Sequence, residues 1–253
     1  MNYDARLKDY VPSRRRSLGG LLGIGFTALS SRLFTVKGAY AETLKPTGGS
    51  GEGPLYPDRM PLDTDNDLIL INDATTPSIG EITHLTGRIL DHNGTPLRNA
   101  FVEIWQCDSA GVYRHSEHEK EAGDEYDKNF QGYGRFLTDA TGTYYFRTIK
   151  PVVYAFKGAN RTPHIHFAVS KNGTRIFTTE MNIKGHPLNN TDFVFNRRTE
   201  AEKKTVLVDF EPIPDSQIGA LSCTFDIVLG FTANDIDGNT IKGGIAPSTW
   251  NRL

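Results

Sequence analysis

Hydrophobic and polar positions alternate along most of the chain in short runs separated by turn residues. Residues 91–96 and 139–142 carry Asn-Gly and Asp/Gly turn signals. Almost no run follows the 3.6-residue period of a helix, apart from one short helix expected near residues 199–206. The pattern therefore predicts a mainly β, single-domain β-sandwich with long irregular loops and little helix. The runs rich in β-branched and aromatic residues, expected to be strands, are 85–90, 100–106, 135–138, 144–149, 163–170, 174–181 and 222–229.

The front of the chain has a different composition. Arg14 and Arg15 precede a mildly apolar stretch at residues 18–29, and Ala39-Tyr40-Ala41 follows as a small-x-small cleavage signature. Basic, apolar and cleavage regions in this order are typical of a signal peptide, and the paired arginines favour the twin-arginine (Tat) export route. We expect residues 1–41 to be a Tat signal peptide and the mature chain to be periplasmic or extracellular. A basic N-terminal helix without an export role is the alternative.

The remainder is expected to form one domain at residues 42–231, followed by an irregular polar tail at residues 232–253. The net charge of -2 and the pI of about 6.4 provide no basic face, which argues against nucleic-acid binding. No apolar stretch of the mature chain predicts a membrane span. Cys107 and Cys223 are the only cysteines. An exported protein can pair them, but two buried free thiols are at least as good an interpretation.

Two histidines in an expected strand are the first candidates for chemistry. His164 and His166 stand two residues apart, so their side chains point to one face while Ile165 and Phe167 point to the other. A pair of imidazoles on one face is a ready bidentate metal site. A nearby tyrosine, Tyr154, adds a hard oxygen donor that suits ferric iron better than zinc. Taken alone, such a pair also fits two surface or hydrogen-bonded histidines.

Three segments stand out together: WQCDSAGVYRH at 105–115, FRTIKPVVY at 146–154 and RTPHIHF at 161–167. Together they resemble the intradiol ring-cleavage dioxygenases, in particular the protocatechuate 3,4-dioxygenase type. They occur in the family's order, and the match extends from about residue 53 to about residue 180. Catechol dioxygenases of the same superfamily carry a helical N-terminal dimerisation segment that this sequence does not support, so the shorter protocatechuate type is the nearer comparison.

The resemblance implies a site and a reaction. The family holds a ferric ion with two tyrosines and two histidines, which here would be Tyr113, Tyr154, His164 and His166, with one non-haem Fe(III) per chain. Tyr154 would also be the phenolate that the substrate displaces, and Arg161 would stabilise negative charge on the substrate ring. The implied partners are O2 and a catechol-type aromatic, cleaved between its hydroxyl-bearing carbons to a cis,cis-muconate-type product. A homo-oligomer is compatible with the resemblance.

Three departures from the family pattern concern the substrate pocket. Glu180 stands where protocatechuate-type enzymes commonly have glutamine, and its carboxylate could pair with Arg161. Leu55 takes a place that is often aromatic and lines the pocket. The gap between Tyr154 and His164 is shorter than in the protocatechuate type, so the pocket rim should differ. The identity of the catechol therefore cannot be transferred from the family.

Two other functions remain open at this point. An exported, non-enzymatic β-sandwich binding module explains the strands and turns, and it needs none of the tyrosines and histidines to converge. A hydrolase or cupin-like enzyme with zinc or ferrous iron also uses a His-x-His pair. That second alternative requires a carboxylate ligand in place of the tyrosines, and the sequence shows no evident partner.

Overall fold

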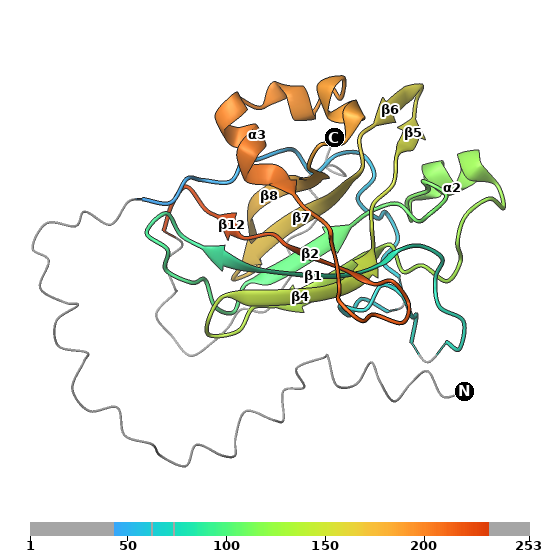
Figure 1. Ribbon diagram of the computed structural model, residues 1–253, viewed down its shortest axis with the longest axis horizontal. Coiled ribbons are helices and arrows are strands. Elements are labelled where there is room, and N and C mark those ends of the chain that lie inside the picture. The colour runs from blue at the N-terminus through green and yellow to red at the C-terminus, as the bar shows by residue number, and fades with distance from the viewer. Residues whose placement is uncertain (1–42, 62, 73, 233–253) are drawn as a thin grey trace, which may run out of the picture. The chain divides into compact units, whose positions relative to one another are not determined.

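The computed structural model of the protein describes residues 43–61, 63–72 and 74–232. The signal peptide expected at residues 1–41 lies outside the described residues, as does the expected tail beyond residue 232. The described part is built from two layers of strands, with short helices on its periphery (Figure 1). The prediction of a mainly β, sandwich-like fold is confirmed.

One sheet is organised around its longest strand, β1, which is antiparallel to β4 on one side. On its other side β1 runs parallel to β11 and then to β12. The short strand β10 completes this sheet by pairing with β11. The bounds are β1 (Ile82–Leu90), β4 (Thr143–Ile149), β10 (Glu211–Pro212), β11 (Leu221–Thr224) and β12 (Ile227–Val228).

The second sheet has the strand order β3-β2-β7-β8-β9 and is antiparallel except where β9 joins β8. Its centre is β7, which pairs with β2 on one side and β8 on the other. Figure 1 shows β7 and β8 side by side, above β1 and β4 in this view. The bounds are β2 (Phe101–Trp105), β3 (Tyr133–Leu137), β7 (His164–Lys171), β8 (Thr174–Ile183) and β9 (Leu207–Val208).

The main hydrophobic core lies between the two sheets. From β7, Ile165, Phe167 and Val169 join it, and from the other sheet Leu85 and Phe146 do so. The intervening residues of β7 face the opposite way, as alternation along a strand requires. All eight residues of β7 are nevertheless buried. A strand of this kind must be covered on both faces, so a second set of packed groups lies over its outer face.

The run at residues 222–229 was expected to be one strand, and the structure divides it into β11 and β12. At the break the backbone carbonyl of Phe225 accepts a hydrogen bond from the buried hydroxyl of Tyr144. Gly87 of β1 lies directly beneath, and a Cβ at that position would overlap the same carbonyl oxygen. The break therefore depends on a close approach of two backbones that only glycine permits.

Within the described ranges, four short helical segments connect the strands: α2 (Ser116–Ala122), η1 (Pro187–Asn190), η2 (Phe195–Arg197) and α3 (Glu200–Val206). The helix expected near 199–206 is α3, which begins with a capping box in which Thr199 and Glu202 exchange hydrogen bonds. The sequence pattern did not indicate α2. No helix among the described residues is long and apolar enough to cross a bilayer.

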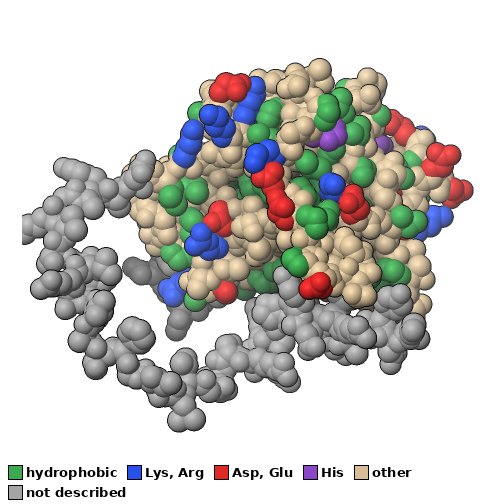
Figure 2. All heavy atoms as spheres, in the orientation of Figure 1, with side chains coloured by type: hydrophobic (Ala, Val, Ile, Leu, Met, Phe, Trp, Pro, Cys, Tyr) green, Lys and Arg blue, Asp and Glu red, His purple; other side chains and the backbone are tan. Residues whose placement is uncertain are grey.

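Charged side chains of both signs are interspersed over the face shown in Figure 2. Cys107 and Cys223 are both buried and free. Cys223 packs into the main core, whereas Cys107 lies in a separate cluster on the outer side of the second sheet. The interpretation as two buried free thiols is therefore the one that the structure supports.

Candidate active site

His164 and His166 project together from the outer face of β7. Their Nε2 atoms are 3.1 Å apart. The Nδ1 atom of His164 donates to the backbone carbonyl of Thr162 at 2.6 Å. Because a carbonyl can only accept, the neutral ring of His164 carries its proton on Nδ1 and presents a lone pair at Nε2. Burial lowers the pKa of both imidazoles, and that of His166 falls well below its ordinary value. Both rings are therefore neutral near pH 7, as metal binding requires.

Tyr113 reaches this pair from the loop that follows β2. The loop turns because the Asp108 carboxylate accepts hydrogen bonds from the backbone N–H groups of Ala110 and Val112, each at 2.9 Å. Gly111 has a left-handed φ of 84°. A Cβ at Gly111 would lie 3.0 Å from the carbonyl oxygen of Val153, so this glycine allows the loop to approach the next segment closely. The hydroxyl of Tyr113 then lies 3.5 Å from Nε2 of His164.

A third histidine, His118 on α2, holds the two tyrosine-bearing segments together. Its Nδ1 accepts from the backbone N–H of Tyr113 at 3.1 Å, and its Nε2 donates to the carbonyl of Ala155 at 3.2 Å. Burial lowers the pKa of His118, which keeps it in the neutral form that these contacts need. The sequence interpretation assigned His118 no role, because a single histidine on a short polar helix gives no pattern to detect.

Tyr154 and Arg161 face one another across a short hairpin made by β5 (Tyr154–Phe156) and β6 (Ala159–Arg161). Lys157 and Gly158 form its turn with φ values of 48° and 79°. Two consecutive positive φ angles define the type I′ geometry that a two-residue hairpin favours. Arg161 Nη1 donates to the hydroxyl of Tyr154 at 3.2 Å. The tight turn accounts for the short gap between Tyr154 and His164.

The structure thus brings Tyr113, Tyr154, His164 and His166 into one cluster. The ring centroids are 4.8 Å apart for the two tyrosines, 5.5 Å for Tyr154 and His164, and 5.9 Å for Tyr113 and His166. Burial raises the pKa of both phenols, and the neighbouring Arg161 only partly offsets this for either. Without a cation the phenols are therefore neutral, and the phenolate forms require a positive charge at the centre of the cluster.

The donor atoms fit a bound metal ion. Bonds of about 2 Å to one metal place neighbouring ligand atoms about 3 Å apart at tetrahedral or octahedral angles. The observed spacings of 3.1 Å between the histidine nitrogens and 3.5 Å from His164 to Tyr113 are close to this value. The Nδ1–H of His164, held by a backbone carbonyl, is the outer contact that orients a metal-binding imidazole.

Glu180 also lies close to the histidines. It is paired with His166 across β7 and β8, and its Oε1 is 3.7 Å from His166 Nδ1 and 3.9 Å from His164 Nε2. These three buried residues form a possible histidine–histidine–carboxylate metal set. However, both oxygens of Glu180 already accept from Arg161 Nη2, at 3.3 and 3.2 Å. His166 would moreover have to use Nδ1, whereas its Nε2 is the atom that faces His164.

Arg161 is held on its other side by Asp192, which follows η1. Arg161 Nε donates to Asp192 Oδ2 at 2.7 Å, and the same oxygen accepts from the backbone N–H of Thr162 at 3.0 Å. Burial opposes the charge of Arg161, but the carboxylates of Glu180 and Asp192 raise its pKa further above the ordinary value. The guanidinium is therefore fixed by two carboxylates with Nη1 directed at Tyr154. No motif in the sequence pointed to Asp192.

The wall behind the histidines is aromatic and apolar. The Trp105 ring stacks on His166 with a centroid distance of 4.8 Å and an interplanar angle of 1°. Leu55 is 2% exposed and belongs to the same cluster as Trp105, Tyr113 and Tyr154. The backbone at Gly53 passes so close that a Cβ there would lie 3.5 Å from the His166 ring. The structure therefore places Leu55 in the same apolar cluster as the two tyrosines, and its contact with substrate stays a prediction.

Buried polar groups anchor the segment that carries Leu55. Glu103 Oε1 accepts from the hydroxyls of Tyr56 at 2.6 Å and Tyr133 at 2.9 Å, and Glu103 Oε2 accepts from Arg175 Nη2 at 2.8 Å. Arg175 also pairs with Glu52. Burial raises the pKa of Glu103, and its partners act in the opposite direction. This network ties residues 52–56 to β2 and β8, over the outer face of the sheet.

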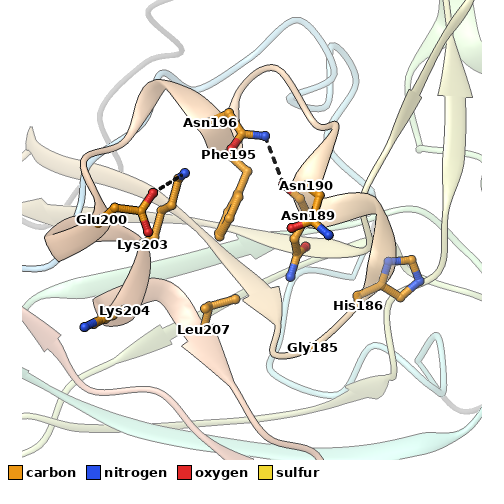
Figure 3. A pocket seen from close by; sticks show the side chains of 10 residues that line it. All are labelled: Gly185, His186, Asn189, Asn190, Phe195, Asn196, Glu200, Lys203, Lys204 and Leu207. Atoms are coloured by element: carbon orange, nitrogen blue, oxygen red, sulfur yellow. Dashed lines mark hydrogen bonds and ion pairs between the residues drawn. The ribbon is translucent and has the colours of Figure 1, made fainter.

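A hollow of about 420 Å³ lies nearby, between η1, η2 and α3, with Phe195 and Leu207 directed into it (Figure 3). None of the tyrosines and histidines of the cluster lines it. Its amides serve the fold: Asn189 accepts from Thr162 and donates to the Ile183 carbonyl, and Asn196 donates to the Asn189 carbonyl. We therefore interpret this hollow as a surface groove and not as the substrate pocket.

Comparisons with known proteins place the chain in a family. The family model described as Dioxygenase matches residues 51–230. The protocatechuate 3,4-dioxygenase beta chain of Burkholderia cepacia is 38% identical over 183 residues, covering 70% of this chain and 76% of the relative. Catechol 1,2-dioxygenase of Acinetobacter baylyi is 31% identical over 195 residues, covering 71% of this chain but only 60% of the relative.

Solved structures agree with this relationship. The dioxygenase domain of a dioxygenase carbohydrate-binding protein fusion from Streptomyces sp. SirexAA-E is 26% identical, with a TM-score of 0.53, covering 74% of this chain and 100% of that chain. Catechol 1,2-dioxygenase from Acinetobacter sp. ADP1 is 27% identical, with a TM-score of 0.56, covering 79% and 68%. The chain belongs to the intradiol ring-cleavage dioxygenase family, a class of oxidoreductases.

Proposed function

We propose that the protein cleaves a catechol-type aromatic with O2 between its two hydroxyl-bearing carbons, using one ferric ion held by Tyr113, Tyr154, His164 and His166. The observation that carries this proposal is the convergence of two buried phenols and two neutral imidazoles around one centre, with donor spacings of 3.1 and 3.5 Å. Relatives named as protocatechuate 3,4-, catechol 1,2- and hydroxyquinol 1,2-dioxygenases support the same chemistry.

Two phenolates suit a trivalent cation because they offset most of its charge inside a buried site. When bound, ferric iron would act as a Lewis acid that draws electron density from the catecholate. The two histidines contribute no charge, since burial keeps them neutral. As the resemblance implies, Tyr154, the tyrosine that Arg161 contacts, would be the one that exchanges. A catechol bound as a dianion would replace the two negative charges of that phenolate and of one hydroxide.

Arg161 would act on both the tyrosine and the substrate. Its Nη1 already donates to the Tyr154 hydroxyl, so it can stabilise that oxygen as an anion or donate to a deprotonated substrate oxygen that takes its place. Its ion pair with Asp192 keeps the guanidinium in position. Leu55 and Trp105 keep the adjoining wall dry, which strengthens these electrostatic effects.

The proposal is tested by oxygen uptake of the purified, iron-loaded protein with catechol, protocatechuate and hydroxyquinol. We expect uptake with at least one of them, a ring-opened dicarboxylic product and a visible absorption band from phenolate bound to ferric iron. A colourless protein that takes up no oxygen with any catechol would contradict the proposal. Light scattering on the same sample measures whether the chain forms the homo-oligomer that the resemblance leaves open.

A second candidate follows from Glu180. A histidine–histidine–carboxylate set would suit zinc or ferrous iron, and the three side chains are close enough to be considered. It requires Glu180 to leave Arg161, and it leaves two buried phenols without a role. The same spectrum separates the candidates, because a site of that kind lacks the phenolate-to-iron band and would be lost in Glu180→Ala but kept in Tyr113→Phe.

We also propose export by the Tat route, supported only by the sequence of residues 1–41. Replacement of Arg14 and Arg15 by lysine should retain the full-length precursor inside cells that possess the pathway. N-terminal sequencing of the exported protein should begin near Glu42. Export that is unaffected by the double replacement would contradict the proposal.

A further inference from the structure

Arg198, between η2 and α3, is a buried cation that lacks a hydrogen bond. Its side chain is 4% exposed, and none of its three guanidinium nitrogens has a hydrogen-bond partner among the described residues. Removing a guanidinium from water without compensation costs several kcal/mol by general estimates. Burial accordingly lowers its pKa. A buried guanidinium without a hydrogen-bond partner calls for a structural or functional explanation.

The other carboxylates near Arg198 are committed elsewhere. Glu202 closes the capping box of α3 by accepting from the backbone N–H of Thr199 at 2.8 Å. Asp192 accepts from Arg161 and from the backbone N–H groups of Val194 and Phe195. The remaining carboxylate is that of Glu180, whose Oε2 lies 3.9 Å from Arg198 Nη1. This is an ion-pair distance but not a hydrogen bond.

Glu180 therefore lies between two guanidinium groups. Its oxygens are 3.3 and 3.2 Å from Arg161 Nη2, and on the other side it faces Arg198. A charge-assisted hydrogen bond is about 2.8 Å long, so a shift of about 1 Å would transfer the carboxylate from one arginine to the other. The position that releases Arg161 is the one that satisfies the orphaned nitrogens of Arg198.

The contact that would be released is a functional one. Arg161 uses Nε for Asp192 and Nη1 for the Tyr154 hydroxyl, and Nη2 is the nitrogen that Glu180 occupies. A substrate anion that approaches Arg161 has to compete with Glu180 for Nη2. A second cation behind Glu180 lowers the cost of that competition, because the displaced carboxylate remains paired.

We propose that Arg198 is a positioning residue that receives Glu180 when substrate enters, and so frees Arg161 Nη2 to bind the substrate. The part of this inference that concerns the substrate rests on the proposed function. The electrostatic coupling between Arg198 and Glu180 does not depend on it. The Glu180 carboxylate thus has two alternative partners: Arg161 in the substrate-free site and Arg198 in the occupied site.

The decisive experiment is a double-mutant cycle of Arg198→Met and Glu180→Gln, read as KM and kcat for catechol and protocatechuate. In the presence of Glu180, Arg198→Met should raise KM about tenfold with a smaller change in kcat, because the carboxylate stays on Arg161. In the Glu180→Gln background, the same replacement should change KM less than threefold. Equal effects in the two backgrounds would overturn the proposal, since a purely structural role of Arg198 predicts them.

Two further variants guard against misfolding. Arg198→Lys keeps a positive charge and should hold KM within about threefold of the wild type. Arg197→Met removes the neighbouring arginine, which is exposed and lies 5.6 Å from the Phe193 ring, and it should leave KM unchanged in both backgrounds. An effect of Arg197→Met as large as that of Arg198→Met would point to a general loss of positive charge and would contradict the proposal.

A measurement on the iron-free protein separates this inference from the proposed function. Urea unfolding of the four proteins in the cycle should show that the double variant is less destabilised than the sum of the single variants. Part of the cost of Glu180→Gln comes from leaving the buried Arg198 without a facing carboxylate, and that part disappears once Arg198 is replaced. Additive stabilities would overturn the coupling. If the stabilities are non-additive but the protein takes up no oxygen with any catechol, the coupling between Arg198 and Glu180 is retained and only the proposed function is rejected.

Discussion

On the inner face of β7, Ile165 and Phe167 pack into the core between the sheets, while on the outer face His164 and His166 meet two tyrosines and a glutamate. Every residue of the strand is buried, so exposure does not distinguish the two faces. What differs is the need for partners. The inner face is satisfied by shape alone, whereas each polar group on the outer face requires a particular neighbour at a particular distance.

This comparison predicts that the two faces fail in different ways. Replacement of a proposed metal ligand on the outer face should abolish metal-dependent chemistry and spare the fold, whereas replacement on the inner face should weaken the fold first. The following predictions test that separation, beginning with the largest expected effect.

Tyr113→Phe should eliminate the visible band and oxygen uptake. The variant removes a single oxygen from the proposed ligand set, and loss of a direct ligand should cost more than the 10- to 100-fold in metal affinity that outer contacts typically contribute. Iron content, the absorption spectrum and oxygen uptake measure the effect. Tyr145→Phe, on the other sheet, serves as a control that should keep its colour. Full activity in Tyr113→Phe would refute the ligand assignment.

Phe167→Ala should lower the free energy of unfolding by about 3–5 kcal/mol, the usual cost of emptying a large aromatic site in a core. Phe167 is fully buried and contacts Tyr144 and Phe225 of the opposite sheet at centroid distances of 5.9 and 5.0 Å. Urea unfolding of the iron-free protein measures the change. Phe193→Ala is the matched control, because Phe193 is 52% exposed and should cost far less. Equal losses in the two variants would argue against the assigned core.

Glu103→Gln tests the polar part of the outer face away from the metal ligands. The replacement keeps the shape but removes the charge that holds Arg175, and we expect a loss of about 1–3 kcal/mol in the free energy of unfolding. Because Tyr56 also depends on Glu103, the loss of Leu55 packing should appear as a higher KM for catechols. A stability equal to that of the wild type would mean that the network is not needed to hold residues 52–56.

His118→Gln should reduce the pH dependence of stability. Burial lowers the pKa of His118, so below about pH 6.5 the unfolded chain binds a proton more readily than the folded chain does. Stability contributed by the neutral ring is thus present above that pH and decreases as the pH falls toward the folded pKa. Unfolding of the iron-free protein between pH 5 and 8 measures how the free energy of unfolding changes with pH. In the variant this slope should correspond to up to one fewer proton taken up on unfolding. An unchanged slope would exclude His118 as a contributor.

Cys107 and Cys223 are expected to give the smallest effect. Burial raises the pKa of each thiol to about 12, so neither forms a thiolate near pH 7. A thiol reagent should therefore label neither residue in the native protein and both after unfolding, as mass spectrometry would show. Labelling of Cys107 alone in the native state would indicate that the outer cluster opens more readily than the core.

The sequence was most informative where the structure depends on alternation along one strand. The opposite orientations of His164 and Ile165 follow from the two-residue period, and the structure confirms them. The helix α3 could be anticipated because its charged residues and its Thr199 cap are local features. The proposed ligands were reached through the resemblance, since only Tyr154 and the histidine pair stood out as candidate chemistry before it.

The remaining features depend on contacts between distant segments. His118 joins residues on either side of β3 and β4, and no short-range signal marks such a role. Asp192 and Arg198 follow η1 and η2, yet they act on Arg161 and Glu180 through the folded chain. The division of residues 222–229 into two strands required the Tyr144 hydroxyl to reach the Phe225 carbonyl. Each of these depends on three-dimensional proximity, which a linear pattern does not contain.

The hairpin that joins Tyr154 to Arg161 has a consequence for how pockets of this kind can vary. Its two-residue turn leaves no slack, and side chains on paired strands change sides with every single step. Inserting one residue at Lys157 would reverse which side chains of one strand point inward and which point outward. The Arg161 guanidinium would then point away from the Tyr154 phenol. Proteins that share this short connection can therefore diversify their substrates by swapping side chains around the hairpin, but not by lengthening it one residue at a time.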